Sequence, residues 1–272
     1  MTDVDDRPLI LCSNDDGFFS HGLRALAEAL STFARVVVVA PETEQSATSH
    51  SLTLHRPLRL RRYAEDRYAV DGTPADCVYL AVHLGESGSA TPVLTRKPDL
   101  VVSGINRGIN LGQDIFYSGT VAAAREGALR GIPSIAASVG VVADESGSYV
   151  FEPVWAAELV AKVAQAVLAL PKKPGPALLF NLNVPAGPVK GLVATKLGTR
   201  LWTEAVDARI DPRGRAYFWL GGHGVEHDQI PGSDTEAYDA GLASLSVLGL
   251  DLARHDGEAR AAADAVVGSA TR

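Results

Sequence analysis

Residues 9–40 read LILCSNDDGFFSHGLRALAEALSTFARVVVVA and indicate the fold class of the chain. The first five of these residues form the kind of apolar run found in strands that are buried on both faces of a parallel sheet. Leucine and alanine then recur at helical spacing over 21–30, and a second apolar run at 36–40 ends at Pro41. Strand, loop, helix and strand in this order predict a βαβ unit with a right-handed crossover.

Similar patterns continue the sheet along the chain. Apolar runs at 99–103, 132–139 and 177–184 predict further strands. Amphipathic spacing at about 120–129 and 155–170 predicts two further helices. Strands that alternate with helices in this way are typical of a parallel sheet covered by helices.

The segment 52–76 has a different pattern. Apolar and polar residues alternate at 52–54, 58–62 and 68–70, which indicates short antiparallel strands at an edge of the sheet. Thr73-Pro74-Ala75-Asp76 combines a helix N-cap, a proline in the first turn and an acid at the capping-box position. A helix is therefore expected to follow directly.

Beyond Pro185 the sequence becomes β-rich and irregular. The expected fold class is α/β: a Rossmann-like three-layer sandwich with a mostly parallel sheet, plus a smaller β-rich C-terminal extension. The expected domains are a Rossmann-like catalytic core at 1–188, a β-rich extension for oligomer assembly at 189–253 and a flexible tail at 254–272.

The composition argues against several classes of protein. The 272 residues carry a formal net charge of −7, whereas a surface for duplex nucleic acid needs a basic footprint. No apolar run approaches the length of a membrane helix, and residues 1–7 do not resemble a secretory signal, so we expect a cytoplasmic protein with no membrane partner. Cys12 and Cys77 lie in apolar contexts and are expected to be buried small side chains rather than a disulfide.

The ligand site is expected at the carboxyl ends of the parallel strands, where the strand order reverses. This rule selects the loops that follow Ser13, Ala40 and Ser103. The first loop is Asn14-Asp15-Asp16-Gly17, and its adjacent carboxylates raise each other's pKa unless a hard cation such as Mg²⁺ or Mn²⁺ neutralises them. The alternative is an Asx-turn in which these side chains cap their own backbone, and the residues alone leave both interpretations open.

The other two loops supply further polar groups. The loop at 41–51 is hydroxyl-rich and brings Ser46 to the same edge of the sheet. The glycine-rich loop at 103–112 leads to Ser118-Gly119-Thr120 at the start of a helix, where free N–H groups can bind phosphate. The alternative is a flexible linker with an ordinary N-cap. Neither a Walker A loop, a dinucleotide fingerprint nor a nucleophile elbow is present.

Taken in order, several segments resemble the SurE (survival protein E) family of 5'/3'-nucleotidases. They are LCSNDDG at 11–17, SLTL at 51–54, VDGTPADCV at 70–78, PDLVVSGINRG at 98–108, YSGTVAAA at 117–124, NLNVP at 181–185 and SDTEA at 233–237. The resemblance extends over nearly the whole chain, to about Leu250, and the number of long motifs makes it specific.

The resemblance implies a metal-dependent phosphomonoesterase that hydrolyses nucleoside 5'- and 3'-monophosphates to nucleoside and phosphate. One divalent cation per subunit, Mg or Mn, would be held by Asp15, Asp16, Ser46 and Asn106. The implied catalytic residues are Asp15, Asp16 and Asn106. The implied substrate and phosphate contacts are Asn14, Ser46, Asn106, Ser118, Gly119 and Thr120.

The resemblance also implies a homodimer or homotetramer, because the C-terminal extension of this family exchanges between subunits. The extension carries apolar residues that a neighbouring subunit would cover. They are Leu201, Trp202, Tyr217, Phe218 and Trp219. The alternative is that the extension folds back on its own subunit as a lid over the site.

Two departures from the family pattern concern substrate preference. Residues 44–47 are acidic and bulky where a basic residue and a glycine often flank the serine, and 18–22 lacks a proline often found before the glycine. Two other functions are alternatives to this one. A haloacid-dehalogenase-type phosphatase needs two aspartates separated by one residue, whereas Asp15 and Asp16 are adjacent. A nucleotide-binding regulator without turnover would share the site but release no phosphate.

Overall fold

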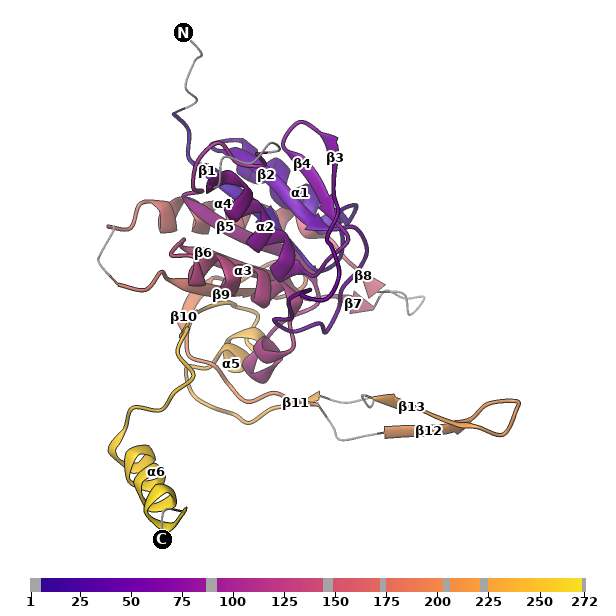
Figure 1. Ribbon diagram of the computed structural model, residues 1–272, viewed down its shortest axis with the longest axis vertical. Coiled ribbons are helices and arrows are strands. Elements are labelled where there is room, and N and C mark those ends of the chain that lie inside the picture. Colours follow the sequence, from indigo (N-terminus) through magenta and orange to yellow (C-terminus); the bar gives the residue numbers. More distant parts are fainter. Residues whose placement is uncertain are drawn as a thin grey trace.

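The structure is a computed structural model that describes residues 6–86, 92–143, 149–171, 175–202, 206–220 and 225–270. Its centre is a nine-stranded sheet with the strand order β10-β15-β9-β6-β5-β1-β2-β4-β3 (Figure 1). The fold is the α/β sandwich expected from the sequence, with a mostly parallel sheet between two layers of helices.

The middle of the sheet consists of the strands that apolar runs predicted. These strands are β1 (Leu9–Ser13), β2 (Arg35–Pro41), β5 (Leu100–Arg107), β6 (Ser134–Val139) and β9 (Leu179–Val184). They pair in parallel, and almost every residue in them is buried. The strands that follow β1 in the chain lie on opposite sides of it, with β2 on one side and β5 on the other. The switch point therefore lies between the ends of β1 and β5.

One edge of the sheet is formed by β4 (Arg67–Val70), which runs parallel to β2, and β3 (Leu60–Ala64), which runs antiparallel to β4. The prediction of a strand at 52–54 is wrong, since these residues form no strand. The N–H of Thr53 instead donates to the carboxylate of Asp76, so it is not available to a neighbouring strand.

At the other edge, β15 (Ala243–Leu248) runs antiparallel to β9, and β10 (Leu192–Thr195) pairs with β15. Two strands from the segment 189–253 thus complete the main sheet. The part of that segment that leaves the sheet lies between β11 (Leu201–Trp202) and β14 (Val225–Glu226).

Two pairs of helices cover the sheet. Helices α1 (His21–Ser31) and α4 (Pro153–Leu168) bury their apolar sides in one core cluster. Helices α2 (Pro74–Glu86) and α3 (Gly119–Leu129) pack against each other and contribute to two separate clusters. Each face of the sheet therefore has its own apolar core, as in other three-layer sandwiches.

An arm projects from the body (Figure 1). It consists of the hairpin β12 (Val206–Ile210) and β13 (Ala216–Leu220). Phe218 and Trp219 are 61% and 60% exposed there, whereas the side chains of Leu201 and Trp202 lie outside the described residues. The exposed rings agree with the expectation of an unsatisfied apolar surface, and what covers that surface stays a prediction.

The smaller elements complete the chain. They are the 3₁₀ helix η1 (Gly112–Phe116), the hairpin of β7 (Val142–Ala143) with β8 (Tyr149–Val150), α5 (Asp234–Asp239) and α6 (Gly257–Ala270). The segment 254–272 therefore contains an exposed helix, and its flexibility stays a prediction. Cys12 and Cys77 are free and buried, as expected. Among the described residues, no helix has both the length and the hydropathy needed to cross a bilayer.

Candidate active site

The loop after β1 is fixed by the side chain of Asn14. Its Nδ2 donates to the carbonyl of Gly17 at 3.0 Å and to the hydroxyl of Ser20, the N-cap of α1, at 2.8 Å. Asn14 is fully buried, and its Oδ1 has no hydrogen-bond partner in the described residues. Asn14 thus makes the local turn that the alternative interpretation predicted, and this turn orients the two aspartates.

Asp15 is buried against the start of α3. Its Oδ2 accepts a hydrogen bond from the N–H of Thr120 at 2.9 Å, and its Oδ1 accepts one from the Thr120 hydroxyl. A side chain at Gly119 would place its Cβ 2.8 Å from the Cβ of Asp15, so only glycine permits this approach. Burial raises the pKa of Asp15, the hydrogen bonds from Thr120 oppose this rise, and the Glu44 carboxylate adds to it.

Asp16 is less buried than Asp15 and lies in the same loop. Its Oδ2 accepts a hydrogen bond from the N–H of Arg107, the last residue of β5, at 3.1 Å. Burial and the adjacent Asp15 carboxylate raise the pKa of Asp16 to about 6, while the bond from Arg107 acts in the opposite direction. Asp16 therefore links the ends of β1 and β5 across the switch point.

The loop after β2 meets these aspartates. The N–H of Gln45 donates to the backbone carbonyl of Asp15 at 2.7 Å, and Ser46 Oγ donates to Glu44 Oε1 at 2.7 Å. Glu44 raises the pKa of both Asp15 and Asp16. Three carboxylates thus lie close enough to disfavour one another's charge.

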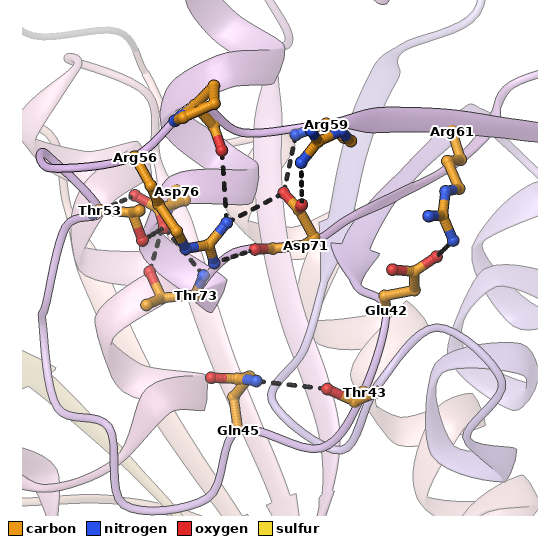
Figure 2. Close-up of polar contacts among 11 residues, drawn as sticks. Glu42, Thr43, Gln45, Thr53, Arg56, Arg59, Arg61, Asp71, Thr73 and Asp76 are labelled. Carbon is orange, nitrogen blue, oxygen red and sulfur yellow. Dashed lines mark hydrogen bonds and ion pairs between the residues drawn. The ribbon is translucent and has the colours of Figure 1, made fainter.

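Several contacts anchor the rest of this loop. Ser49 donates its N–H to Tyr117 and its hydroxyl to Phe116, just before α3. Farther along, Asp76 accepts hydrogen bonds from Thr53 and from the N–H of Thr73, as Figure 2 shows. Asp76 and Thr73 also form the predicted reciprocal capping box.

These loops surround a cavity of about 710 Å³. Of the residues predicted for the site, Asp16 and Ser46 line it directly. Asn106 precedes the wall residue Arg107, and its Nδ2 donates to the carbonyl of Gly108, which leaves its Oδ1 as the remaining ligand atom. The full wall is Asp16, Ser20, His21, Glu44, Ser46, Arg107, Val141 and Phe151.

The predicted phosphate contacts in α3 have a different role in this structure. Thr120 is fully buried, and both of its donors go to Asp15. The Ser118 hydroxyl accepts the N–H of Val121 as the N-cap of the helix. Thr120 therefore holds Asp15 rather than facing the cavity.

Several wall residues were not predicted as site residues. Glu44 lies two positions before Ser46, and His21 follows the acidic loop closely, so their proximity in the sequence was the available signal. Phe151 and Val141 belong to no motif, and only the folding of the β7–β8 region brings them to the cavity.

The available ligand atoms suit a hard cation. Asp15, Asp16, Ser46 and Asn106 offer oxygen atoms, and Mg²⁺ and Mn²⁺ prefer oxygen. A cation would relieve the mutual repulsion that raises the pKa of both aspartates. In the described residues no group of three or more His, Cys, Asp and Glu side chains is arranged to hold a metal, so neutral oxygens would have to complete the ligand set.

Fold and site together define a three-layer α/β protein with an acidic, oxygen-rich cavity at the switch point of its sheet. The family model described as "Survival protein SurE" matches residues 10–204. A protein of Sorangium cellulosum named 5'-nucleotidase SurE is 57% identical over 255 residues, which cover 92% of this chain and 94% of that protein. The protein of that name in Myxococcus xanthus is 48% identical over 230 residues, or 84% and 82% of the two chains.

A solved structure supports the same assignment. The crystal structure of the SurE protein from Aquifex aeolicus has a TM-score of 0.75 and 38% sequence identity, and the match covers 91% of this chain and 96% of that one. The chain belongs to the SurE family.

Proposed function

We propose that this SurE-family enzyme hydrolyses nucleoside 5'-monophosphates, and 3'-monophosphates as well, to nucleoside and inorganic phosphate. The single observation that carries the proposal is the position of Asp16 and Ser46 on the wall of the switch-point cavity, with Asp15 behind them. The names of the relatives support the 5'-nucleotidase part of this proposal.

One divalent cation, Mg²⁺ or Mn²⁺, would be held by Asp15, Asp16, Ser46 and Asn106. When bound, it supplies Lewis-acid polarisation of the phosphoryl group. Asp15 has both carboxylate oxygens fixed by Thr120, and each oxygen retains a further lone pair for a ligand bond. Thr120 thus acts as a positioning residue for Asp15.

The chain's own groups have separate tasks in this reaction. Asp16 faces the cavity, so it is the better placed of the two aspartates to accept a proton from the attacking water. Arg107 contributes a guanidinium to the wall, and Asn106 lies beside it, so both can stabilise the negative charge of the phosphate. Asn14 donates to the wall residue Ser20, Ser118 caps α3, and Gly119 lies against Asp15, so contacts of these three residues with the phosphate stay predictions.

The arm is proposed to assemble the protein into a homodimer or homotetramer. Val206, Ala208 and Ile210 alternate with polar residues along β12, and Ala208 lies opposite Phe218 of β13. Tyr217 and Trp219 lie on the other face, opposite Arg209 and Asp207. A two-stranded hairpin with exposed apolar side chains is marginal alone, and a second copy would cover them. Because nucleoside monophosphates are cytoplasmic metabolites, we place the enzyme in the cytoplasm.

The cation requirement can be tested by measuring phosphate release. Protein treated with EDTA and then dialysed should release no inorganic phosphate from a nucleoside 5'-monophosphate, and added Mn²⁺ or Mg²⁺ should restore release. Parallel reactions with 3'-monophosphates test the wider substrate range. Undiminished release without any divalent cation would reject the metal site.

A further inference from the structure

The switch-point cavity has an apolar wall that phosphate hydrolysis does not require. Phe151 and Val141 form this wall, and His21 lies beside them. Phe151 is only partly buried, although it also packs against the core beneath α1 and α4. An aromatic ring on the wall of a mainly polar cavity is typical of a surface for a flat organic group.

The ring stands close to the end of β5 that carries Asn106 and Arg107. A Cβ at Gly22 would lie 2.0 Å from the carbonyl oxygen of Ile105 and 3.2 Å from Cζ of Phe151. Both groups therefore approach the same point on the first turn of α1. Because Asp16, Arg107 and Phe151 all line this one cavity, a single molecule in it can contact the proposed phosphate-binding end and Phe151 at the same time.

His21 adds hydrogen-bonding capacity to this wall. Its side chain is exposed, and within the described residues it makes no hydrogen bond or ion pair. A neutral imidazole has one donor and one acceptor nitrogen, so it can bind the polar edge of a heterocycle.

We propose that Phe151 and His21 form the nucleobase subsite of this enzyme, an inference that rests on the proposed function. Phe151 stacks on the face of the base, and His21 bonds to its edge. Stacking on an aromatic ring accepts any base, so Phe151 sets affinity for nucleotides in general. Hydrogen bonds distinguish bases, so His21 sets the preference among them.

A second aromatic cluster provides a matched control. Phe18, Phe19 and Tyr63 line or adjoin a separate cavity of about 300 Å³ that shares only Ser20 with the first. Phe19 is 70% exposed, so replacing it removes a comparable ring without touching the switch-point cavity.

The test compares a nucleoside 5'-monophosphate with ribose 5-phosphate, which has the same sugar and phosphate but no base. Phe151→Leu should lower kcat/KM for AMP by roughly 5- to 150-fold, mainly through KM, and leave ribose 5-phosphate within about twofold. Phe151→Tyr should restore the wild-type value, and Phe19→Ala should change neither substrate. His21→Ala should alter the ranking of AMP, GMP, CMP and UMP. Thermal denaturation of each variant shows whether it is folded.

Failure of the nucleobase subsite and failure of the proposed nucleotidase activity give different results in these assays. Equal losses on both substrates in folded Phe151→Leu would overturn the subsite, as would a selective loss in Phe19→Ala instead. Wild-type protein that releases phosphate from neither compound would overturn the proposed function itself. Competitive inhibition by adenosine that disappears in Phe151→Leu would support the subsite independently of the chemical step.

Discussion

Asp15 accepts two hydrogen bonds from Thr120, one from its N–H and one from its hydroxyl. The first residues of α3 thereby bind a carboxylate of the enzyme itself. This arrangement uses the anion affinity of a helix N-terminus to stabilise a buried aspartate whose pKa is raised by its burial.

Removing the Thr120 hydroxyl should weaken the enzyme in two ways. Thr120→Val is expected to destabilise the fold by about 1–2 kcal/mol, because a buried carboxylate loses one donor. It should also lower kcat, because Asp15 is less firmly placed. Thr120→Ser retains the hydroxyl and is the matched control. Wild-type stability and turnover in Thr120→Val would contradict the positioning role.

The raised pKa of Asp16 leads us to expect that wild type and an Asp16 variant differ in stability in a pH-dependent way. Its pKa rises from 3.8 to about 6 on folding, so its contribution favours the folded state at low pH and is lost as the pH rises through 6. In EDTA, Asp16→Asn should therefore be more stable than wild type above pH 6, by on the order of 1 kcal/mol after allowance for partial exposure. The difference should vanish below about pH 4.

A bound divalent cation should make wild type more stable than Asp16→Asn at pH 7. Saturating Mn²⁺ is expected to raise the denaturation temperature of wild type at pH 7 more than that of Asp16→Asn, because the variant has lost a ligand. Denaturation curves for both proteins, with EDTA and with Mn²⁺, measure both effects. Equal shifts with Mn²⁺ would place the cation elsewhere.

The buried carboxylate of Glu126 should contribute to acid sensitivity. It contacts His50 Nε2 at 2.9 Å and Arg130 at 2.7 Å. Burial alone would raise the pKa of Glu126, but these partners lower it, so its stabilisation is present above the unfolded pKa and lost as the pH falls through the folded one.

Glu126→Gln is accordingly expected to cost about 2 kcal/mol at pH 7, less than a wholly buried pair, because Arg130 is 33% exposed. The cost should shrink in acid. Asp264→Asn, which breaks the exposed pair with Arg260, should leave the stability at pH 7 nearly unchanged. Urea denaturation at pH 7 and pH 4 measures all three proteins. A cost for Glu126→Gln that is the same at both pH values would contradict the ion pair.

We expect the arm to hold subunits together, mainly through the face of the hairpin that carries Ile210. Ile210 is 73% exposed on the face of the hairpin that also carries Phe218, and Arg209 points to the other face. Ile210→Asp should shift the mass seen in light scattering towards the 28.6 kDa monomer, whereas Arg209→Gln should not. A wild-type protein that is monomeric at micromolar concentration would contradict the assembly role and favour the lid.

Much of the fold was predictable because buried parallel strands appear as uninterrupted apolar runs. Such runs located β1, β2, β6 and β9, and glycine and proline marked their ends. The hydrophobic pattern did not predict which strands pair at the edge of the sheet. Nothing in residues 192–195 or 243–248 shows that they extend the main sheet, because pairing depends on contacts far away in the sequence.

Only part of the candidate site was predictable from the sequence. The switch-point rule selected the loops that carry Asp16 and Ser46, because these loops follow recognisable strands. It could not show that Thr120 holds Asp15, since a helix N-terminus suits a side-chain carboxylate as well as a phosphate. Phe151 had no signal at all, because an isolated phenylalanine most often belongs to a core.

The position of the active site at the switch point is tested by phosphate release from a nucleoside 5'-monophosphate, measured for wild type, Asp16→Asn and Asp207→Asn at saturating Mn²⁺. Asp207 lies on the arm, so its variant controls for the general effect of losing a carboxylate. We expect Asp16→Asn to stay folded and to lose at least about 10²-fold in kcat, whereas Asp207→Asn should keep wild-type turnover. Wild-type turnover in folded Asp16→Asn would contradict the assignment of the active site.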